Sequence, residues 1–103
     1  MELVVEGNKD VLQIRILGEL VAESCSDLRD MVLESAAKEP HTVVLYMAET
    51  PFIDTSGVGV LVGLRAHLRS KGIGIEIASP SPRVRQVLQM MRLLPVFGLS
   101  DDA

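Results

Sequence analysis

Two short apolar runs, residues 2–6 and 11–17, open the chain. In the second run Gln13 and Arg15 alternate with aliphatic residues, which is the two-residue period of a strand with one buried face. Residues 7–10 (Gly-Asn-Lys-Asp) lie between the runs and have the composition of a hairpin turn. The pattern predicts an antiparallel pair of strands at the start of the domain.

Three later segments repeat apolar residues at helical spacing, and each predicts an amphipathic helix. The first begins near Ser24, a residue type that can cap a helix, and runs to about Lys38. The second covers residues 58–71, with leucines along one side and basic residues along the other. The third begins at Ser81 and Pro82, because proline fits the first helical position.

Two further strands are predicted between the helices. Residues 42–47 form a continuous apolar run, typical of a central strand covered on both faces, and residues 72–78 form another short strand, with alternating residues. The element order predicts one α/β domain over residues 1–99, with a mixed, mostly parallel β-sheet of four to five strands covered by three main helices. Residues 94–99 are expected to form a short closing element, and residues 100–103 a disordered tail.

Composition limits the classes of function. The 103 residues carry a formal net charge of -4 and only 3% aromatic residues, so neither a basic surface nor a stacking platform for nucleic acid is expected. Cys25 is the single cysteine, which excludes an intramolecular disulfide and suits a reducing cytoplasm. Glu2 stands where a signal peptide would carry basic residues, and no apolar run approaches about 20 residues, so membrane insertion is not expected.

The search for catalytic motifs predicts a protein that is not an enzyme and needs no cofactor. Gly57 and Gly59 lack the lysine and the flanking spacing of a phosphate-binding loop. His41 and His67 have no Cys, Asp or Glu at metal-ligand spacing, so no metal site is expected. Cys25 is interpreted as a small packing residue without a chemical role.

The segment 54–57 (Asp-Thr-Ser-Gly) places two hydroxyl groups where an apolar segment meets the second helix. The free N–H groups of a helix N-terminus attract negative charge, so a phosphate on Ser56 would be tolerated there and would change the surface. The other reading is that Asp54 or Thr55 is an N-cap and Ser56 an ordinary residue of the first turn. Local spacing leaves both readings open.

Three glycines near the start of the second helix require an explanation, because each costs about 0.5–1 kcal/mol relative to alanine. Gly59 and Gly63 are four residues apart and could let the helix approach the sheet closely. Gly57 lies on another face, and its missing side chain would leave room around Ser56 for a kinase or for the backbone of a partner.

The sequence resembles the STAS domains, and specifically the bacterial anti-sigma factor antagonists, over nearly its whole length. The resemblance lies in residues 16–20 (Ile-Leu-Gly-Glu-Leu), 43–45 (Val-Val-Leu), 52–61 with the Asp-Thr-Ser-Gly element, and 79–84 before the third helix. It implies a phosphorylation-gated protein that sequesters an anti-sigma factor and thereby regulates transcription. The implied partners are an anti-sigma factor with serine kinase activity and a serine phosphatase that resets the switch.

The resemblance assigns roles to single residues. Ser56 is the implied phosphorylation site, Asp54 orients its hydroxyl or caps the helix, and Thr55 is the less favoured acceptor. Together with Gly57 these residues form the predicted site. If the loop before Ser56 and the first turns of the helix bind the partner, apolar contacts are expected from Val58, Leu61 and Val62.

Two positions depart from the family pattern, because Val21 and Tyr46 stand where such domains commonly have Asp. Tyr46 is interpreted as a core aromatic with its hydroxyl at the rim, or as the lining of a partner groove. The loss of both acids suits an alternative function, in which the domain is a cytoplasmic accessory subunit of an ABC-type membrane transporter.

Overall fold

The computed structural model describes residues 1–100, which form a four-stranded sheet and three helices. Its elements are the strands β1 (Glu2–Gly7), β2 (Val11–Leu17), β3 (Thr42–Tyr46) and β4 (Gly74–Ala78), the helices α1 (Cys25–Ala36), α2 (Thr55–Ser70) and α3 (Pro82–Met90), and the 3-10 turns η1 (Ala22–Ser24) and η2 (Pro95–Phe97). The strand order is β1-β2-β3-β4; β1 pairs with β2 antiparallel, and the other pairs are parallel. The predicted fold class is confirmed.

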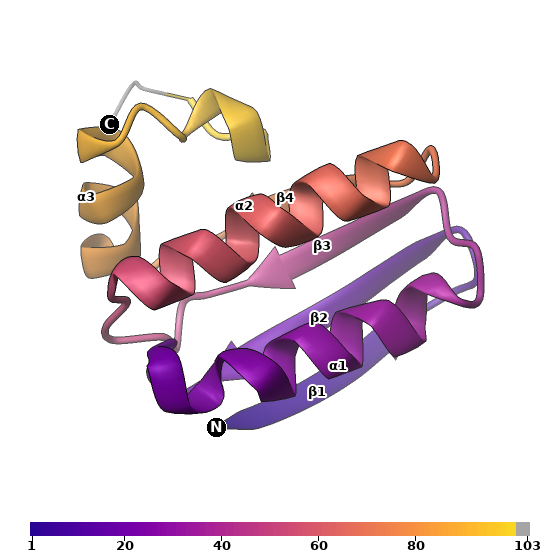
Figure 1. Ribbon diagram of the computed structural model, residues 1–103, viewed down its shortest axis with the longest axis horizontal. Coiled ribbons are helices and arrows are strands. Elements are labelled where there is room, and N and C mark those ends of the chain that lie inside the picture. The colour runs from indigo at the N-terminus through magenta and orange to yellow at the C-terminus, as the bar shows by residue number, and fades with distance from the viewer. Residues whose placement is uncertain (101–103) are drawn as a thin grey trace.

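Both long helices lie on the same face of the sheet, where they run side by side in the same direction, while α3 stands at one end (Figure 1). Along β3, Val43 and Leu45 are buried, whereas Val44 and Tyr46 on the other face are half-buried. The prediction that this strand is covered on both faces is therefore wrong. Each crossover, β2-α1-β3 and β3-α2-β4, places its helix on the one face, which leaves the opposite face of the sheet without a helix.

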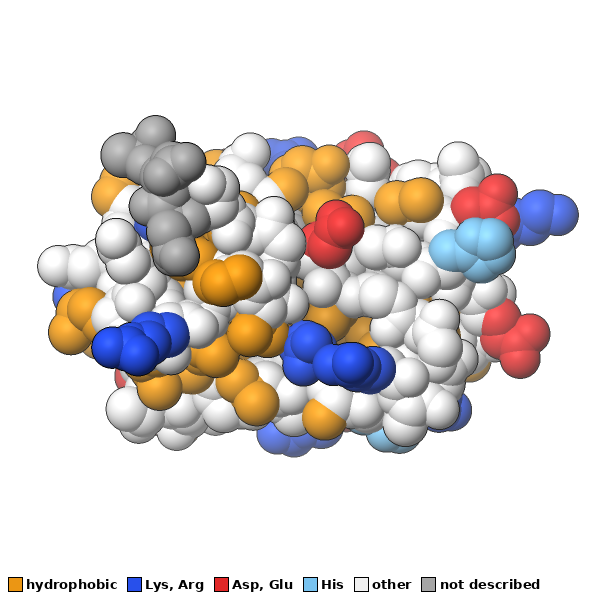
Figure 2. All heavy atoms as spheres, turned by 90° about the horizontal axis from the view of Figure 1, so that it is seen from above, with side chains coloured by type: hydrophobic (Ala, Val, Ile, Leu, Met, Phe, Trp, Pro, Cys, Tyr) orange, Lys and Arg blue, Asp and Glu red, His pale blue; other side chains and the backbone are white. Residues whose placement is uncertain are grey.

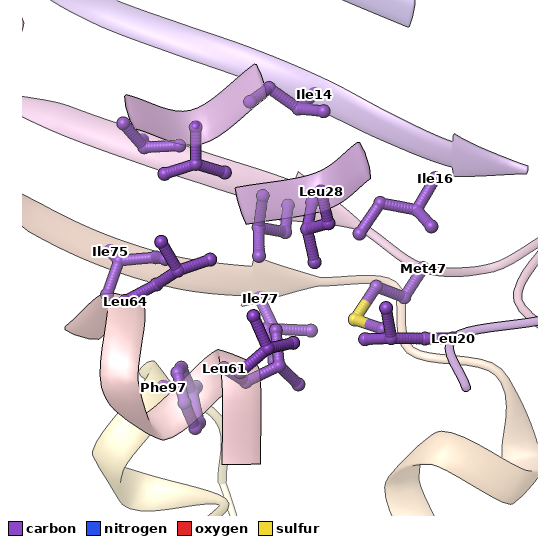
Figure 3. Close-up of a cluster of buried hydrophobic side chains, with 14 of the residues drawn as sticks. Ile14, Ile16, Leu20, Leu28, Met47, Leu61, Leu64, Ile75, Ile77 and Phe97 are labelled. Atoms are coloured by element: carbon purple, nitrogen blue, oxygen red, sulfur yellow. The ribbon is translucent and has the colours of Figure 1, made fainter. Parts of the chain in front are cut away.

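The core fills the space between this covered face and the helices. Figure 3 shows side chains of β2, α1, α2 and β4 pointing toward one another, with Phe97 of η2 closing the cluster beside α2. The completely buried side chains include Ile14, Ile16, Leu28, Leu61 and Phe97. Close packing of these aliphatic side chains holds α1 and α2 in fixed positions on the sheet.

The helix starts were predicted with mixed success. The helix α3 begins at Pro82 as predicted, and Ser81 caps it, because its Oγ accepts a hydrogen bond from the Val84 amide at 3.2 Å. Ser24 does not cap α1; its Oγ accepts from the Val21 amide at 3.0 Å and donates to the Glu19 carbonyl, so it stabilises the turn before the helix instead. Of the predicted tail, only Ser100 is described, and residues 101–103 lie outside the described part of the chain.

Two buried hydroxyl groups fasten the loop between β3 and α2. The Ser81 Oγ donates to the Thr50 carbonyl at 2.6 Å, and the Thr50 Oγ1 donates to the Ile16 carbonyl at 2.9 Å. Both side chains are nearly or completely buried, so each bond is made away from water, where a lost partner is costly. These bonds tie the start of α3 and the end of β2 to the segment that leads into α2.

We expect Ser81→Ala to lower the free energy of unfolding by about 1–3 kcal/mol, because it removes a helix cap and leaves the buried Thr50 carbonyl without its donor. Urea denaturation followed by circular dichroism measures the change. Ser26→Ala is the matched control, since Ser26 is exposed on α1 and its loss should change stability by less than about 0.5 kcal/mol. Equal stabilities for the two variants would show that the Ser81 hydroxyl does not stabilise the loop.

Candidate functional site

The start of α2 is fixed by the Asp54 carboxylate, which binds backbone amides on two segments. Its Oδ1 accepts a hydrogen bond from the Gly57 amide at 2.9 Å, the bond of an N-cap. Its Oδ2 accepts from the Ala22 amide at 3.3 Å, in the turn before α1. The cap explains why α2 begins at Thr55, three residues before the helix start predicted from the apolar pattern.

A backbone bridge strengthens the same junction. Leu20 pairs with Ile53 in parallel, and the Leu20 carbonyl accepts from the Asp54 amide at 3.3 Å. The Leu20 amide in turn donates to the Phe52 carbonyl at 3.0 Å. The chain after β2 and the chain before α2 are thus held together by side-chain and backbone bonds.

Ser56 is the second residue of α2, and its side chain is exposed. Its position in the first turn places the hydroxyl at the positive end of the helix dipole. Thr55 beside it is also exposed, whereas Asp54 is half-buried in its capping contacts. The predicted phosphorylation site therefore lies at the surface, where another protein can reach it.

A groove of about 460 Å³ separates α1 from α2 and begins at Ser56. We call it the α1–α2 groove; its lining includes Arg29 and Leu33 from α1 and Ser56, Gly59, Gly63 and His67 from α2. The α2 residues recur every three or four positions, so they form one face of the helix. The spacing of the α2 residues can be recognised in the sequence, but the contribution of α1 to the groove cannot.

The glycines of α2 have the opposite roles to those predicted. A Cβ on Gly57 would lie 2.4 Å from the Leu20 carbonyl oxygen and 2.7 Å from Ile53 Cγ1, so this glycine admits the domain's own backbone and leaves no room for a partner. A Cβ on Gly59 or Gly63 would meet nothing within 4 Å. These two residues do not bring the helix closer to the sheet; they leave the wall of the α1–α2 groove without side chains.

Two of the three residues predicted to contact a partner belong to the core. Val58 is 4% exposed and Leu61 is 0% exposed, because they lie on the side of α2 that packs on the sheet. Val62 is 42% exposed and remains available. Leu33, at 36% exposed, was missed, since its contribution depends on how α1 lies beside α2.

Cys25 lies at the first position of α1 and is buried. Burial raises the pKa of the thiol, the negative charge of Asp54 raises it further, and the positive charge of Arg29 lowers it. The raised pKa keeps the thiol protonated at neutral pH, which agrees with its interpretation as a packing residue. The charges of Asp54 and Arg29 thus both act on the thiol at the start of α1.

The two positions that depart from the family pattern lie apart. Val21 is half-buried next to Ala22, whose amide binds Asp54, so it adjoins the candidate site. Tyr46 is half-buried on the uncovered face of the sheet, paired with Arg15 on β2 and Ala78 on β4. Tyr46 is therefore neither a core residue nor part of the α1–α2 groove.

Outside the α1–α2 groove, the described surface has few clusters of side chains of one kind. Among residues 1–100 no three His, Cys, Asp or Glu side chains gather in a way that could hold a metal ion, and no helix is long and apolar enough to cross a membrane. Figure 2 shows charged side chains of both signs scattered over the upper face, with hydrophobic side chains gathered at the end where α3 lies. Met90 and Met91 are 74% and 50% exposed there.

Known proteins share both the sequence pattern and the fold. The family model of the STAS domain matches residues 2–103. An anti-sigma F factor antagonist from Paenibacillus polymyxa is 27% identical over 99% of this chain and 88% of its own length. A STAS-domain containing protein from Pseudomonas aeruginosa is 30% identical over 86% of this chain and 87% of its own length.

The structural comparison agrees with these relatives. The anti-sigma factor antagonist SpoIIAA in its unphosphorylated form has a TM-score of 0.80 and 24% identity, covering 98% of this chain and 90% of that chain. The phosphorylated form of SpoIIAA, a Bacillus cell fate determinant, has a TM-score of 0.73 and 23% identity, covering 98% and 93%. The arrangement of strands and helices is thus shared.

The glycine geometry predicts opposite effects for two matched substitutions in α2. Gly57→Ala should lower the free energy of unfolding by about 1–3 kcal/mol, because the added methyl group overlaps the Leu20 carbonyl. Gly59→Ala should raise it by about 0.5–1 kcal/mol, because alanine favours the helix and the new side chain meets no neighbour. Urea denaturation of both variants measures the difference, and a Gly57→Ala protein as stable as the unsubstituted one would contradict the close contact.

Proposed function

The chain belongs to the STAS domain family, and we propose that it is an anti-sigma factor antagonist whose binding to its partner is switched by phosphorylation of Ser56. The relative from Paenibacillus polymyxa carries the name of such an antagonist, and SpoIIAA has been solved with and without phosphate. The observation that carries the proposal is the exposed Ser56 side chain in the first turn of α2, at one end of the α1–α2 groove.

The proposed partner is an anti-sigma factor with serine kinase activity, which acts in the cytoplasm. In the transfer step a bond forms between the Ser56 Oγ and the γ-phosphorus of ATP, the bond to the ADP oxygen breaks, and the hydroxyl proton leaves to a base of the kinase. Asp54 is not that base in this proposal, because both of its oxygens accept backbone hydrogen bonds. The domain supplies the acceptor and its position, and the kinase supplies the catalysis.

The α1–α2 groove is the proposed docking surface of the unphosphorylated state. Gly59 and Gly63 allow a partner's backbone to approach α2 closely, and Leu33 on the other wall offers apolar contact. Val62 follows Gly59 by three residues and adjoins it on the helix surface. Small residues beside exposed aliphatic side chains suit the burial of a partner's apolar segment.

Phosphorylation would change this surface without unfolding it. A phosphate carries about -1.5 to -2 charges at pH 7, and a position in the first turn of a helix favours such a charge. The contacts that hold the start of α2 involve Asp54, Gly57 and Leu20, none of which is modified. The negative charge would weaken the docking of an apolar segment at the end of the groove. A serine phosphatase would restore the hydroxyl.

Substitutions at two adjacent exposed positions test the switch. Ser56→Asp should weaken binding to the proposed partner kinase, isolated by co-purification with this protein, by about tenfold or more, because it places a charge in the groove. Ser56→Ala should bind as the unsubstituted protein does, and it should lose the phosphate that mass spectrometry detects after incubation with kinase and ATP. Thr55→Asp adds the same charge one residue away, outside the groove lining, and should change binding much less.

Two outcomes would reject the proposal. Undiminished binding by Ser56→Asp would remove the switch, and a phosphate located on Thr55 would move the site. The transporter alternative makes a different prediction, in which the protein co-purifies with a membrane complex and Ser56 receives no phosphate from a soluble kinase. Affinity purification followed by mass spectrometry distinguishes the two functions.

A further inference from the structure

We propose that Arg29 of α1 binds the phosphate on Ser56 across the α1–α2 groove and thereby closes the docking surface from within the domain. The inference rests on the proposed phosphorylation of Ser56 and states how the phosphate would change the docking surface. The phosphorylated state would then be an occluded state of the domain, in addition to a more negative one. The loss of binding would then have two causes, the added negative charge and the occlusion of the groove by Arg29.

The two groups face each other across one groove. Arg29 and Ser56 both line it and both are exposed, Arg29 in the second turn of α1 and Ser56 in the first turn of α2. The two helices start toward the same end of the domain and run side by side in the same direction (Figure 1), and the groove between them is lined by both residues. Packed helices lie about 8–10 Å apart, a gap that an arginine and a phosphorylated serine can bridge together.

Arg29 is available for this contact. Within residues 1–100 it makes no ion pair and no side-chain hydrogen bond. It is also the only Lys or Arg in the described lining of the groove. The lining also contains His67, which lies eleven residues beyond Ser56 along α2. A guanidinium group binds phosphate oxygens with two parallel hydrogen bonds, which makes Arg29 suited to the role.

Negative charges also lie beside Ser56 and at the start of α1. Asp54 caps the helix two residues earlier, and Glu23 lies in the turn before α1; both act on the nearby Cys25 thiol together with Arg29. The Asp54 oxygens are already engaged by backbone amides, so they do not compete for Arg29 by ideal hydrogen bonds. Arg29 is the basic side chain that shares the groove lining with Ser56, so its removal should change the titration of a phosphate on Ser56.

The test uses full-length protein in which phosphoserine is inserted at position 56 during translation, so no native kinase is needed. Phosphorus NMR across a pH titration reports the second pKa of the phosphate, which lies near 6 in an unperturbed phosphoserine. Arg29→Gln should raise this pKa by about half a unit, the size of shift expected from loss of an exposed ion pair. Arg29→Lys should keep part of the lowered value, since it retains the charge.

Arg69→Gln is the matched control, because Arg69 is an exposed arginine of α2 that lines a different surface hollow. It should leave the phosphate pKa unchanged. Equal titrations for the Arg29→Gln and unsubstituted proteins would overturn the inference, as would an equal rise in Arg29→Gln and Arg69→Gln. If no kinase partner exists, the proposed function fails while the titration still shows whether Arg29 binds the phosphate.

Discussion

The contact between the backbone at Leu20 and the first turn of α2 determines the geometry of the whole site. The Leu20 carbonyl accepts from the Asp54 amide, the Asp54 side chain accepts from Ala22, and Gly57 lies against Leu20 with no space for a methyl group. These contacts fix the rotation of α2 about its axis. With Gly57 turned inward, Ser56 and Gly59 are turned outward, so a packing constraint inside the domain sets what its surface presents.

Much of this arrangement could be predicted from the sequence. Alternation in β2, the proline after Ser81 and the hydroxyl-rich segment before α2 are local signals, and local signals locate strands, helix starts and the exposed serine. The prediction failed where the answer depended on segments far apart in the chain. Whether Gly57 or Gly59 meets another backbone depends on Leu20, which lies 37 residues before Gly57.

The helices cover only one face of the sheet, and this explains the other residues whose burial was predicted wrongly. An apolar run such as β3 predicts a strand buried on both faces, yet its outer residues Val44 and Tyr46 are only half-buried. Val58 and Leu61 are apolar residues near Ser56 in sequence, but helical rotation turns them to the core. Arg29 was not predicted because nothing in its own segment distinguishes it from a solvated residue; its proposed role depends on the neighbouring helix.

The bonds at the start of α2 do not involve the Ser56 side chain. Because Asp54, Gly57 and Leu20 already satisfy the junction, a modified serine changes surface chemistry while the backbone stays as it is. In the proposed switch, the rate of partner exchange would then be set by enzyme turnover and complex dissociation, with no slow refolding step.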